Sequence, residues 1–213
     1  MSSERLFRFS GVALLVGGLL AALFTLIGML LFPGNNSPTN ALWMPVQLLI
    51  FVGALLVLLG LPAIYVRQAR QVGWLGLIGF ILTFLAALII GVGGWIATGI
   101  IYPWLAVDAP KLAAGQGPPA LNAVIIISTL LFAVGTIMLG LATMRAGVFS
   151  RWAGLLLLTS GVVVAVSAAP FPPVMSTLVS NIGMVVFFLS LAWIGYSLWA
   201  AKGAEISQQI PAL

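Results

Sequence analysis

Six long apolar runs, separated by short polar connections, constrain this chain more than any other feature of its sequence. Each run is near or above the about 18 residues needed to cross a hydrocarbon layer of roughly 30 Å. The runs cover approximately residues 10–32, 42–65, 73–101, 121–144, 152–170 and 176–201. A backbone in lipid must satisfy its own hydrogen bonds, so each run is expected to be helical. The sequence therefore predicts an all-α membrane protein, a six-transmembrane-helix bundle that forms one integral membrane domain over residues 1–213, with a short cytoplasmic tail at 202–213.

The composition indicates the same class of protein. Hydrophobic residues make up 62% of the chain and charged residues 5%, against about 45–50% and about 25% in soluble domains. The chain has no cysteine and no histidine, which excludes disulfides, thiolate nucleophiles and imidazole ligands for zinc or haem. We therefore expect no cofactor and no metal. The sequence also holds no catalytic constellation, so we expect that the protein is not an enzyme.

The first apolar run is interpreted as a retained span. It follows Arg5 and Arg8, as the hydrophobic region of a secretory signal peptide would. It is longer than a typical signal region, however, and it ends in FPGNNSP without a small-x-small cleavage pattern.

Basic residues fall in alternate connections, and this pattern predicts the topology. Seven of the eight lie before the first run, after the second, after the fourth or after the last: Arg5, Arg8, Arg67, Arg70, Arg145, Arg151 and Lys202. The positive-inside rule then places both termini in the cytoplasm and the protein in the cytoplasmic membrane. The net charge of +5 does not indicate nucleic acid as a partner, because the basic residues occur in ones and twos and form no patch.

A faint internal repeat suggests how the helices are grouped. The first run opens with RFSGVALL and the fifth with RWAGLLLL. Both have an arginine, a small residue and a glycine before the apolar stretch. This likeness suggests three tandem helical hairpins of the same orientation. The alternative is a chance resemblance between apolar helices that use few residue types.

Asp108 and Lys111 are the charged residues of the connection after the third run. Asp108 is a suitable N-cap, Pro110 is tolerated in a first helical turn, and Gly115 would end the short helix that follows. We therefore expect a surface helix that anchors this loop at the outer membrane face. The alternative is a carboxylate that binds a cation or acts as a general base, but such chemistry usually needs a second titratable group.

The spans contain no charged residue, so a proton relay or a voltage sensor has no carrier there. Among the neutral polar residues, Gln47, Asn122 and Asn181 fall toward the outer ends of the even-numbered spans. Together with Asp108 they are candidates for a small polar pocket. The alternative, which we favour, is that each of them forms hydrogen bonds near the lipid headgroups, where polar groups are easily solvated.

Glycine spacing in the third run predicts close helix contacts. Gly73, Gly76 and Gly79 recur at intervals of three, and Gly91 and Gly94 belong to a second cluster. Small residues at such intervals let helix backbones approach each other. The second cluster is not a phosphate-binding loop, because it lacks the GK[ST] ending and a preceding strand.

Three segments, LLGLPAIYVRQA, RAGVFSRWAGLLLL and LAWIGYSLWA, resemble the uncharacterised multi-pass, six-span membrane proteins of unknown function that are common in bacterial genomes. The resemblance implies a bacterial membrane. It implies no activity and no site residues.

These observations lead to a functional hypothesis with alternatives. We expect a non-enzymatic multi-pass membrane protein, a scaffold or accessory subunit whose partners are lipids, other membrane subunits or itself. The first alternative is a facilitator or transporter of a neutral or apolar small molecule. A lipid-modifying enzyme is the least favoured. A wet cavity would favour transport, and tight packing would favour the scaffold.

Overall fold

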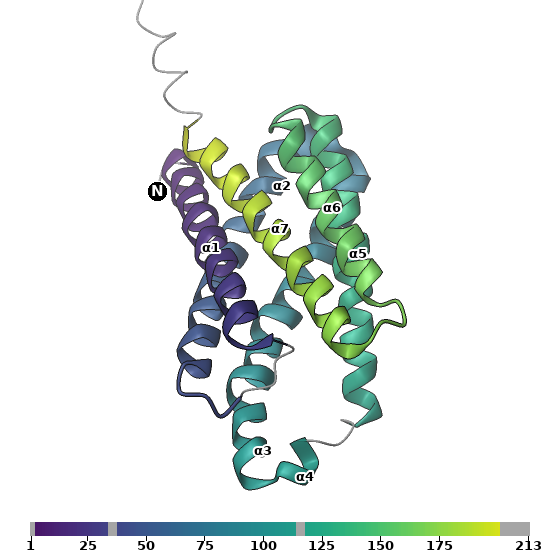
Figure 1. The fold of residues 1–213 in the computed structure, drawn as a ribbon. Coiled ribbons are helices and arrows are strands. Elements are labelled where there is room, and N and C mark those ends of the chain that lie inside the picture. Colours follow the sequence, from purple (N-terminus) through teal and green to yellow (C-terminus); the bar gives the residue numbers. More distant parts are fainter. Residues whose placement is uncertain (1–2, 34–37, 114–117, 201–213) are drawn as a thin grey trace, which may run out of the picture.

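The computed structural model describes residues 3–33, 38–113 and 118–200, and these residues form helices without strands. The elements are α1 (Ser3–Leu31), α2 (Trp43–Leu88), the π-helical segments η2 (Ile89–Gly93) and η3 (Ile96–Ile101), α3 (Tyr102–Asp108), α4 (Pro110–Ala113), α5 (Pro119–Ala146), α6 (Arg151–Ser167) and α7 (Pro173–Ala200), shown in Figure 1. The predicted all-α class is confirmed for this part of the chain. The predicted tail at 202–213 lies outside the described residues.

α2 is a helical hairpin. At Gly73 the backbone has φ 53° and ψ −150°, which is outside the helical region. Tyr65 stacks on Phe80 with ring centroids 5.3 Å apart, so residues on the two sides of Gly73 face each other. Farther from the bend, the indole Nε1 of Trp43 donates a hydrogen bond of 2.8 Å to the carbonyl oxygen of Thr98. The chain therefore turns back at Gly73. We call residues 43–72 the first limb of α2 and residues 74–88 its second limb.

The first limb runs beyond the predicted span end at residue 65. The stretch 66–72, which we expected to be a connection, is helical up to the bend. Its residues VRQARQV include good helix formers and neither glycine nor proline, so nothing in it ends the helix before Gly73.

Four helical stretches among the described residues are long and apolar enough to cross a membrane: Arg5–Leu31, Trp43–Asp108, Pro119–Ala146 and Pro173–Ala200. The second of them is 66 residues long and contains the reversal at Gly73. α6 is also apolar but shorter, with 17 residues. Such lengths and compositions indicate a membrane-embedded protein.

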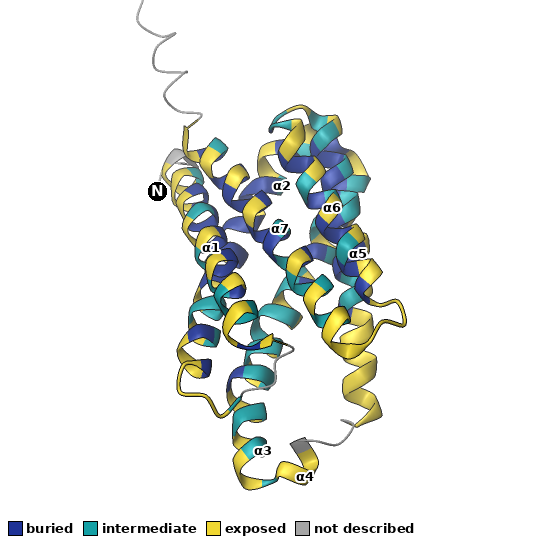
Figure 2. Cartoon of the chain, in the orientation of Figure 1, coloured by how far each residue is buried: buried dark blue, intermediate teal, exposed yellow. Residues whose placement is uncertain are grey.

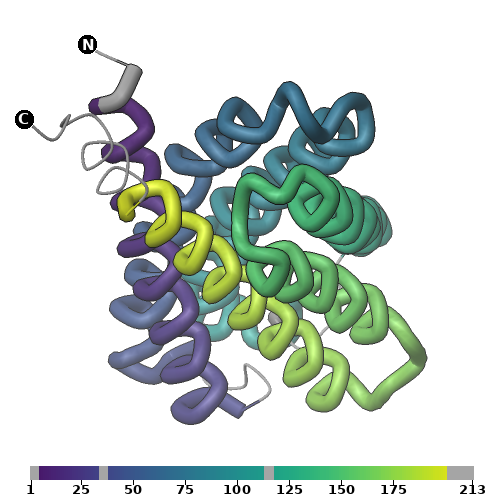
Figure 3. Tube along the Cα trace, turned by 90° about the horizontal axis from the view of Figure 1, so that it is seen from above, coloured from purple at the N-terminus to yellow at the C-terminus, as the bar shows by residue number. Residues whose placement is uncertain are grey.

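The helices pack in chain order, and the last one returns to the first. α1 packs against α2 and α7, α5 packs against α2 and α6, and α6 packs against α7. The first limb of α2 is the part that meets α1, because a Cβ on Gly53 would lie 2.7 Å from the amide nitrogen of Ala21. The second limb meets α5, because a Cβ on Gly79 would lie 2.6 Å from the amide nitrogen of Leu139. The described helices thus form a closed ring, which Figure 3 shows from above.

Glycines bring the backbones close at other interfaces as well. Between α1 and α7, a Cβ on Gly18 would lie 2.5 Å from the carbonyl oxygen of Phe188. Between α5 and α6, a Cβ on Gly140 would lie 2.7 Å from the carbonyl oxygen of Gly154. Backbones approach this closely only where no side chain stands between them. The small residues of these helices are therefore used for packing within the chain.

The five glycines predicted at helix contacts have different roles. A Cβ on Gly76, Gly79 or Gly91 would come within 3.3 Å of another residue, so these three lie at close contacts. A Cβ on Gly73 or Gly94 would meet no atom within 4 Å. Gly73 forms the bend of α2, and Gly94 lies between η2 and η3 with open space beside it.

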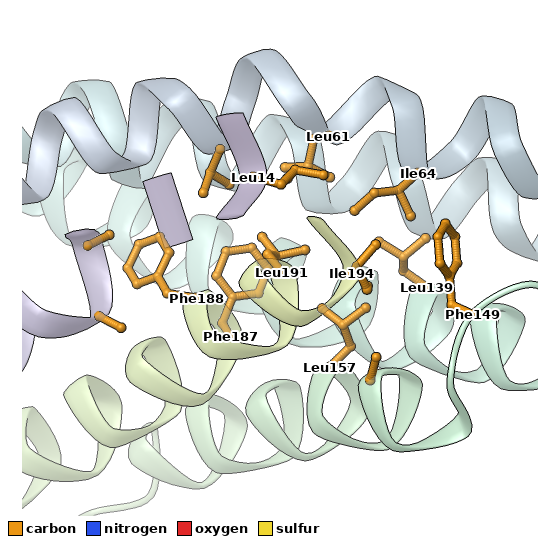
Figure 4. Close-up of a cluster of buried hydrophobic side chains, with 14 of the residues drawn as sticks. Leu14, Leu61, Ile64, Leu139, Phe149, Leu157, Phe187, Phe188, Leu191 and Ile194 are labelled. Carbon is orange, nitrogen blue, oxygen red and sulfur yellow. The ribbon is translucent and has the colours of Figure 1, made fainter. Parts of the chain in front are cut away.

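Large apolar side chains fill the interior of the ring (Figure 4). Phe132 of α5 meets Phe187 of α7 edge to face, with ring centroids 4.8 Å apart, and the ring of Phe188 lies 5.5 Å from that of Phe187. Figure 2 shows that the buried residues face inward. The outward faces are also apolar, with Leu30 as an example at 82% exposure. A bundle that is apolar on both sides is suited to a lipid environment, because its outer surface needs no polar cover there.

Candidate functional site

The interior of the ring holds a small apolar cavity. It is lined by Ala54, Val57, Ala87, Ile90, Gly91, Phe132, Met184, Phe187 and Phe188, which come from both limbs of α2, η2, α5 and α7. The volume of this cavity is about 20 Å³. This is enough for one water molecule, but a water needs polar partners and the lining supplies almost none. The cavity is therefore expected to be dry, and it is too small for an organic solute.

Two of the predicted polar residues lie on the interior face, toward the end of the ring that carries α3 and α4. Gln47 precedes the cavity residue Ala54 by seven residues, and Asn181 precedes the cavity residue Phe188 by seven. Seven residues are about two helical turns, so each polar side chain points to the same side as its cavity residue. Both are half-buried, whereas Asn122 is exposed.

The four residues proposed as a polar pocket are not on neighbouring helices. Gln47 lies on the first limb of α2, Asn122 on α5 and Asn181 on α7. The ring order places another helix between each pair of these three. Asp108 is exposed at the end of α3. Gln47 and Asn181 face one interior from separate helices, and Asn122 and Asp108 are exposed to the surroundings.

The opposite end of the ring, where α2 turns back at Gly73, holds two polar residues that the sequence did not single out as a site. Gln68, on the first limb of α2, is 0% exposed, and its side-chain nitrogen and oxygen both lack a hydrogen-bond partner in the described part of the chain. Thr143, on α5, is also 0% exposed, and its hydroxyl has no partner among the residues that the structure describes. Gln68 stands between two arginines in the sequence, so it resembled part of a polar connection. The spacing of Val57, Leu61 and Ile64 before it was the available signal, because these residues continue one helical face to Gln68.

The glycine-rich stretch that precedes α3, where we expected close helix contacts, forms π-helical turns. Trp95 lies between η2 and η3, and its ring stacks on Phe51 of the first limb with centroids 4.5 Å apart. Its buried indole nitrogen has no hydrogen-bond partner within residues 3–33, 38–113 and 118–200. π-helical turns are wider than α-helical turns. Within η3, the carbonyl oxygen of Thr98 accepts the hydrogen bond from the indole of Trp43.

Asp108 is not the N-cap of a surface helix, so this prediction is wrong. α3 follows η3 without a break as far as Asp108, and the backbone leaves the helical region at Ala109, with φ −144° and ψ 62°. The reason is Pro110, because a residue that precedes proline is disfavoured in the α region. Asp108 and Lys111 are both exposed. Gly115 lies outside the described residues.

The packing register brings the arginines of different helices to one level. Gly79 packs on Leu139, and six residues closer to the bend of α2 on each of these antiparallel helices are Gly73 and Arg145. The side chains of Arg5, Arg8, Arg67, Arg70, Arg145 and Arg151 are all exposed. Figure 1 places the starts of α1 and α6 and the end of α5 at the same end of the bundle. Every described arginine therefore lies at one end, and Asp108 and Lys111 lie at the other.

Comparisons of this chain with protein-family models, with curated proteins and with solved structures found no match, so its function must be inferred from its own packing and chemistry.

Proposed function

We propose that the protein is a non-enzymatic, multi-pass protein of a bacterial cytoplasmic membrane that acts as a scaffold or accessory subunit. The observation that carries this proposal is the filled interior. Phe132, Phe187 and Phe188 close the ring around a cavity of about 20 Å³. Every charged side chain whose burial the structure describes is exposed. In a bundle of this kind, partners bind to the outer surface, and the side chains of the interior serve only for packing.

Six membrane crossings are the second part of the proposal. The reversal at Gly73 divides the 66-residue stretch into two antiparallel segments. The first limb, residues 43–72, is about 45 Å long at 1.5 Å per residue, which exceeds the roughly 30 Å of a hydrocarbon core. α6 has 17 residues, or about 26 Å, which suits a slightly thinned bilayer. The arginine-rich end is the cytoplasmic one by the positive-inside rule, with both termini on that side.

Cysteine labelling tests the six-span topology, and the absence of native cysteine gives it no background. In intact cells, a membrane-impermeant maleimide is expected to label Asn40→Cys. Gln71→Cys and Ser150→Cys are expected to react only after the membrane is opened. Gln71 distinguishes two crossings of residues 43–108 from a single crossing. It is exposed beside the bend, and it would lie in mid-membrane if residues 43–108 crossed once. Labelling of Gln71→Cys in intact cells would contradict the proposed orientation. No labelling in opened membranes would contradict the crossing at Gly73.

The partner surface should lie where small residues remain unused by the ring. Gly93 is exposed, and a Cβ there or on Gly94 would meet no atom within 4 Å. A partner helix could approach the backbone there as closely as the helices of the ring approach one another. The partner is another membrane protein or a second copy of the chain.

Photo-crosslinking in native membranes tests the scaffold role. A crosslinking residue at position 93 is expected to give a discrete protein adduct. The same residue at position 189 is the control, because Leu189 is an exposed apolar residue of α7 that we expect to face lipid. Liposomes that contain the purified protein are expected to release glycerol and urea no faster than protein-free liposomes. Lipid adducts alone at both positions, together with faster solute release, would contradict the scaffold and favour transport.

A facilitator of small neutral molecules is the alternative function, and one observation favours it. The interior is polar at both ends, with Gln47 and Asn181 on the outer side and Gln68 and Thr143 on the inner side. Apolar side chains separate the two polar layers. A solute path between the two polar layers would be closed in the described structure. The release of solute from liposomes, described above, distinguishes a facilitator from a scaffold.

A further inference from the structure

Gln68 is the most unusual side chain in the bundle. A primary carboxamide has two N–H donors and a carbonyl acceptor. At Gln68 all of them are shielded from solvent, and neither the nitrogen nor the oxygen has a partner among the described residues. Buried polar groups in native proteins are nearly always hydrogen-bonded, to the protein or to ordered water. The isolation of Gln68 therefore points to a partner other than the described residues.

Thr143 shows the same isolation, and it differs in this from other buried threonines. The hydroxyl of Thr83 donates to the carbonyl of Gly79 at 2.7 Å, and the hydroxyl of Thr136 donates to the carbonyl of Phe132 at 2.7 Å. Such a bond to the preceding turn is the usual solution for threonine in a helix. The hydroxyl of Thr143 makes no such bond, so it remains available to a ligand.

The two residues face the same interior. Gln68 follows Val57 by 11 residues, and Thr143 follows Phe132 by 11. Eleven residues are about three full turns, so each polar side chain lies on the same helix face as a residue that lines the apolar cavity. The first limb of α2 and α5 both run from the outer end toward the arginine-rich end. Gln68 and Thr143 are therefore displaced from the cavity in the same direction and by the same length.

Their surroundings select a neutral ligand. Ile64 and Leu139 lie one turn before Gln68 and Thr143, and both belong to the same buried apolar cluster as Phe149. Figure 4 draws these three at one end of the cluster. The arginines at this end are exposed, so they disfavour a cation without reaching inward to bind an anion. An amide and a hydroxyl both donate and accept, and the ligand that complements them must do the same.

We propose that Gln68 and Thr143 bind a buried water molecule that bridges the carboxamide and the hydroxyl. We choose water because it is the smallest molecule that both donates and accepts hydrogen bonds, and because Gln68 and Thr143 are both 0% exposed. A buried water typically makes about three hydrogen bonds to otherwise unsatisfied groups, and the two side chains supply that number. This inference concerns the interior and is independent of what the outer surface binds.

A double-mutant cycle on the full-length protein in detergent tests the bridge. Gln68→Leu, Thr143→Val and the double variant are compared by their melting temperatures. Each single change leaves the other side chain with an incomplete partner, so the double variant is expected to melt clearly above the temperature that adding the two shifts predicts. The matched control pairs Gln68→Leu with Thr136→Val, whose hydroxyl already bonds its own helix, and these shifts are expected to add. Additive shifts for Gln68 and Thr143 would overturn the proposal.

X-ray hydroxyl-radical footprinting keeps the proposal testable if a variant does not fold, because it uses the wild-type protein. Water bound inside a protein yields radicals that oxidise adjacent side chains. Phe149, which is 7% exposed, is expected to be oxidised faster than Phe187 beside the dry cavity. In folded Gln68→Leu/Thr143→Val protein the oxidation of Phe149 should fall to the level of Phe187. Equal and low oxidation of both residues in the wild type would overturn the water site.

Discussion

Replacing Gly53 by leucine is expected to destabilise the bundle by about 3 kcal/mol or more, because it overpacks a backbone contact. A Cβ at this position would lie 2.7 Å from the amide nitrogen of Ala21 and 2.8 Å from the carbonyl oxygen of Gly17. Backbone atoms cannot rotate away as a side chain can, so α1 and the first limb of α2 must separate. The separation would also remove dispersion contacts, which hold helices together where lipid is as apolar as the protein.

The matched control is Gly93→Leu. Gly93 is exposed, its Cβ would meet no atom within 4 Å, and it lies in a helical segment as Gly53 does. Leucine is a better helix former than glycine by up to about 1 kcal/mol, so this variant should be as stable as the wild type. Stability is measured by titrating the protein with sodium dodecyl sulfate in mixed micelles and following tryptophan fluorescence. Equal losses in the two variants would contradict the packing described for Gly53.

Asparagine in place of Gly73 is expected to cost about 1–3 kcal/mol, while asparagine in place of Gly147 should cost a few tenths. Both glycines have a positive φ, but their ψ angles differ. Gly147 has φ 64° and ψ 9°, the left-handed helical region that asparagine tolerates. Gly73 has φ 53° and ψ −150°, near a region that is populated essentially by glycine alone. No atom lies within 4 Å of a Cβ on either glycine, so the difference isolates backbone strain.

The same detergent titration measures this pair, and a second readout follows the hairpin itself. Crosslinking between Tyr65→Cys and Phe80→Cys reports whether the limbs of α2 stay paired, since these rings stack 5.3 Å apart. We expect the crosslink to form more slowly in the Gly73→Asn background than in the Gly147→Asn background. Equal stability of the two asparagine variants would show that the chain does not reverse through the backbone angles of Gly73.

Three of the helices, α1, α5 and α7, were predictable from the sequence. The predicted runs 10–32, 121–144 and 176–201 lie close to α1, α5 and α7 (Ser3–Leu31, Pro119–Ala146 and Pro173–Ala200). The agreement has a simple cause, because the length of a buried apolar helix is set by the thickness of the hydrocarbon core. The pairing of the helices into three hairpins of one repeat stays a prediction.

The candidate site was predictable only in part. Gln47 and Asn181 were singled out by composition, and both face the interior. Gln68 was missed because helix α2 continues through the arginine-containing stretch that we expected to be a connection. The direction in which a side chain points depends on whether its residue is still part of the helix. One further helical turn after residue 65 places the side chain of Gln68 in the interior of the ring. The prediction that Asp108 is an N-cap failed for a related reason. Because Ala109 precedes Pro110, the helix is interrupted at Ala109, and Asp108 is the last residue of α3.

The sequence by itself determined that the chain is helical, that its apolar runs are long enough to cross a membrane, and that its arginines fall in alternate connections. These properties follow from composition and spacing along one dimension. The tertiary structure alone decided that the helices close a ring, that glycines meet backbone across its interfaces, and that two polar side chains lose their partners inside it. Such features depend on which face each helix turns to its neighbours, and for helices that are apolar all round, the hydrophobic pattern does not specify that face.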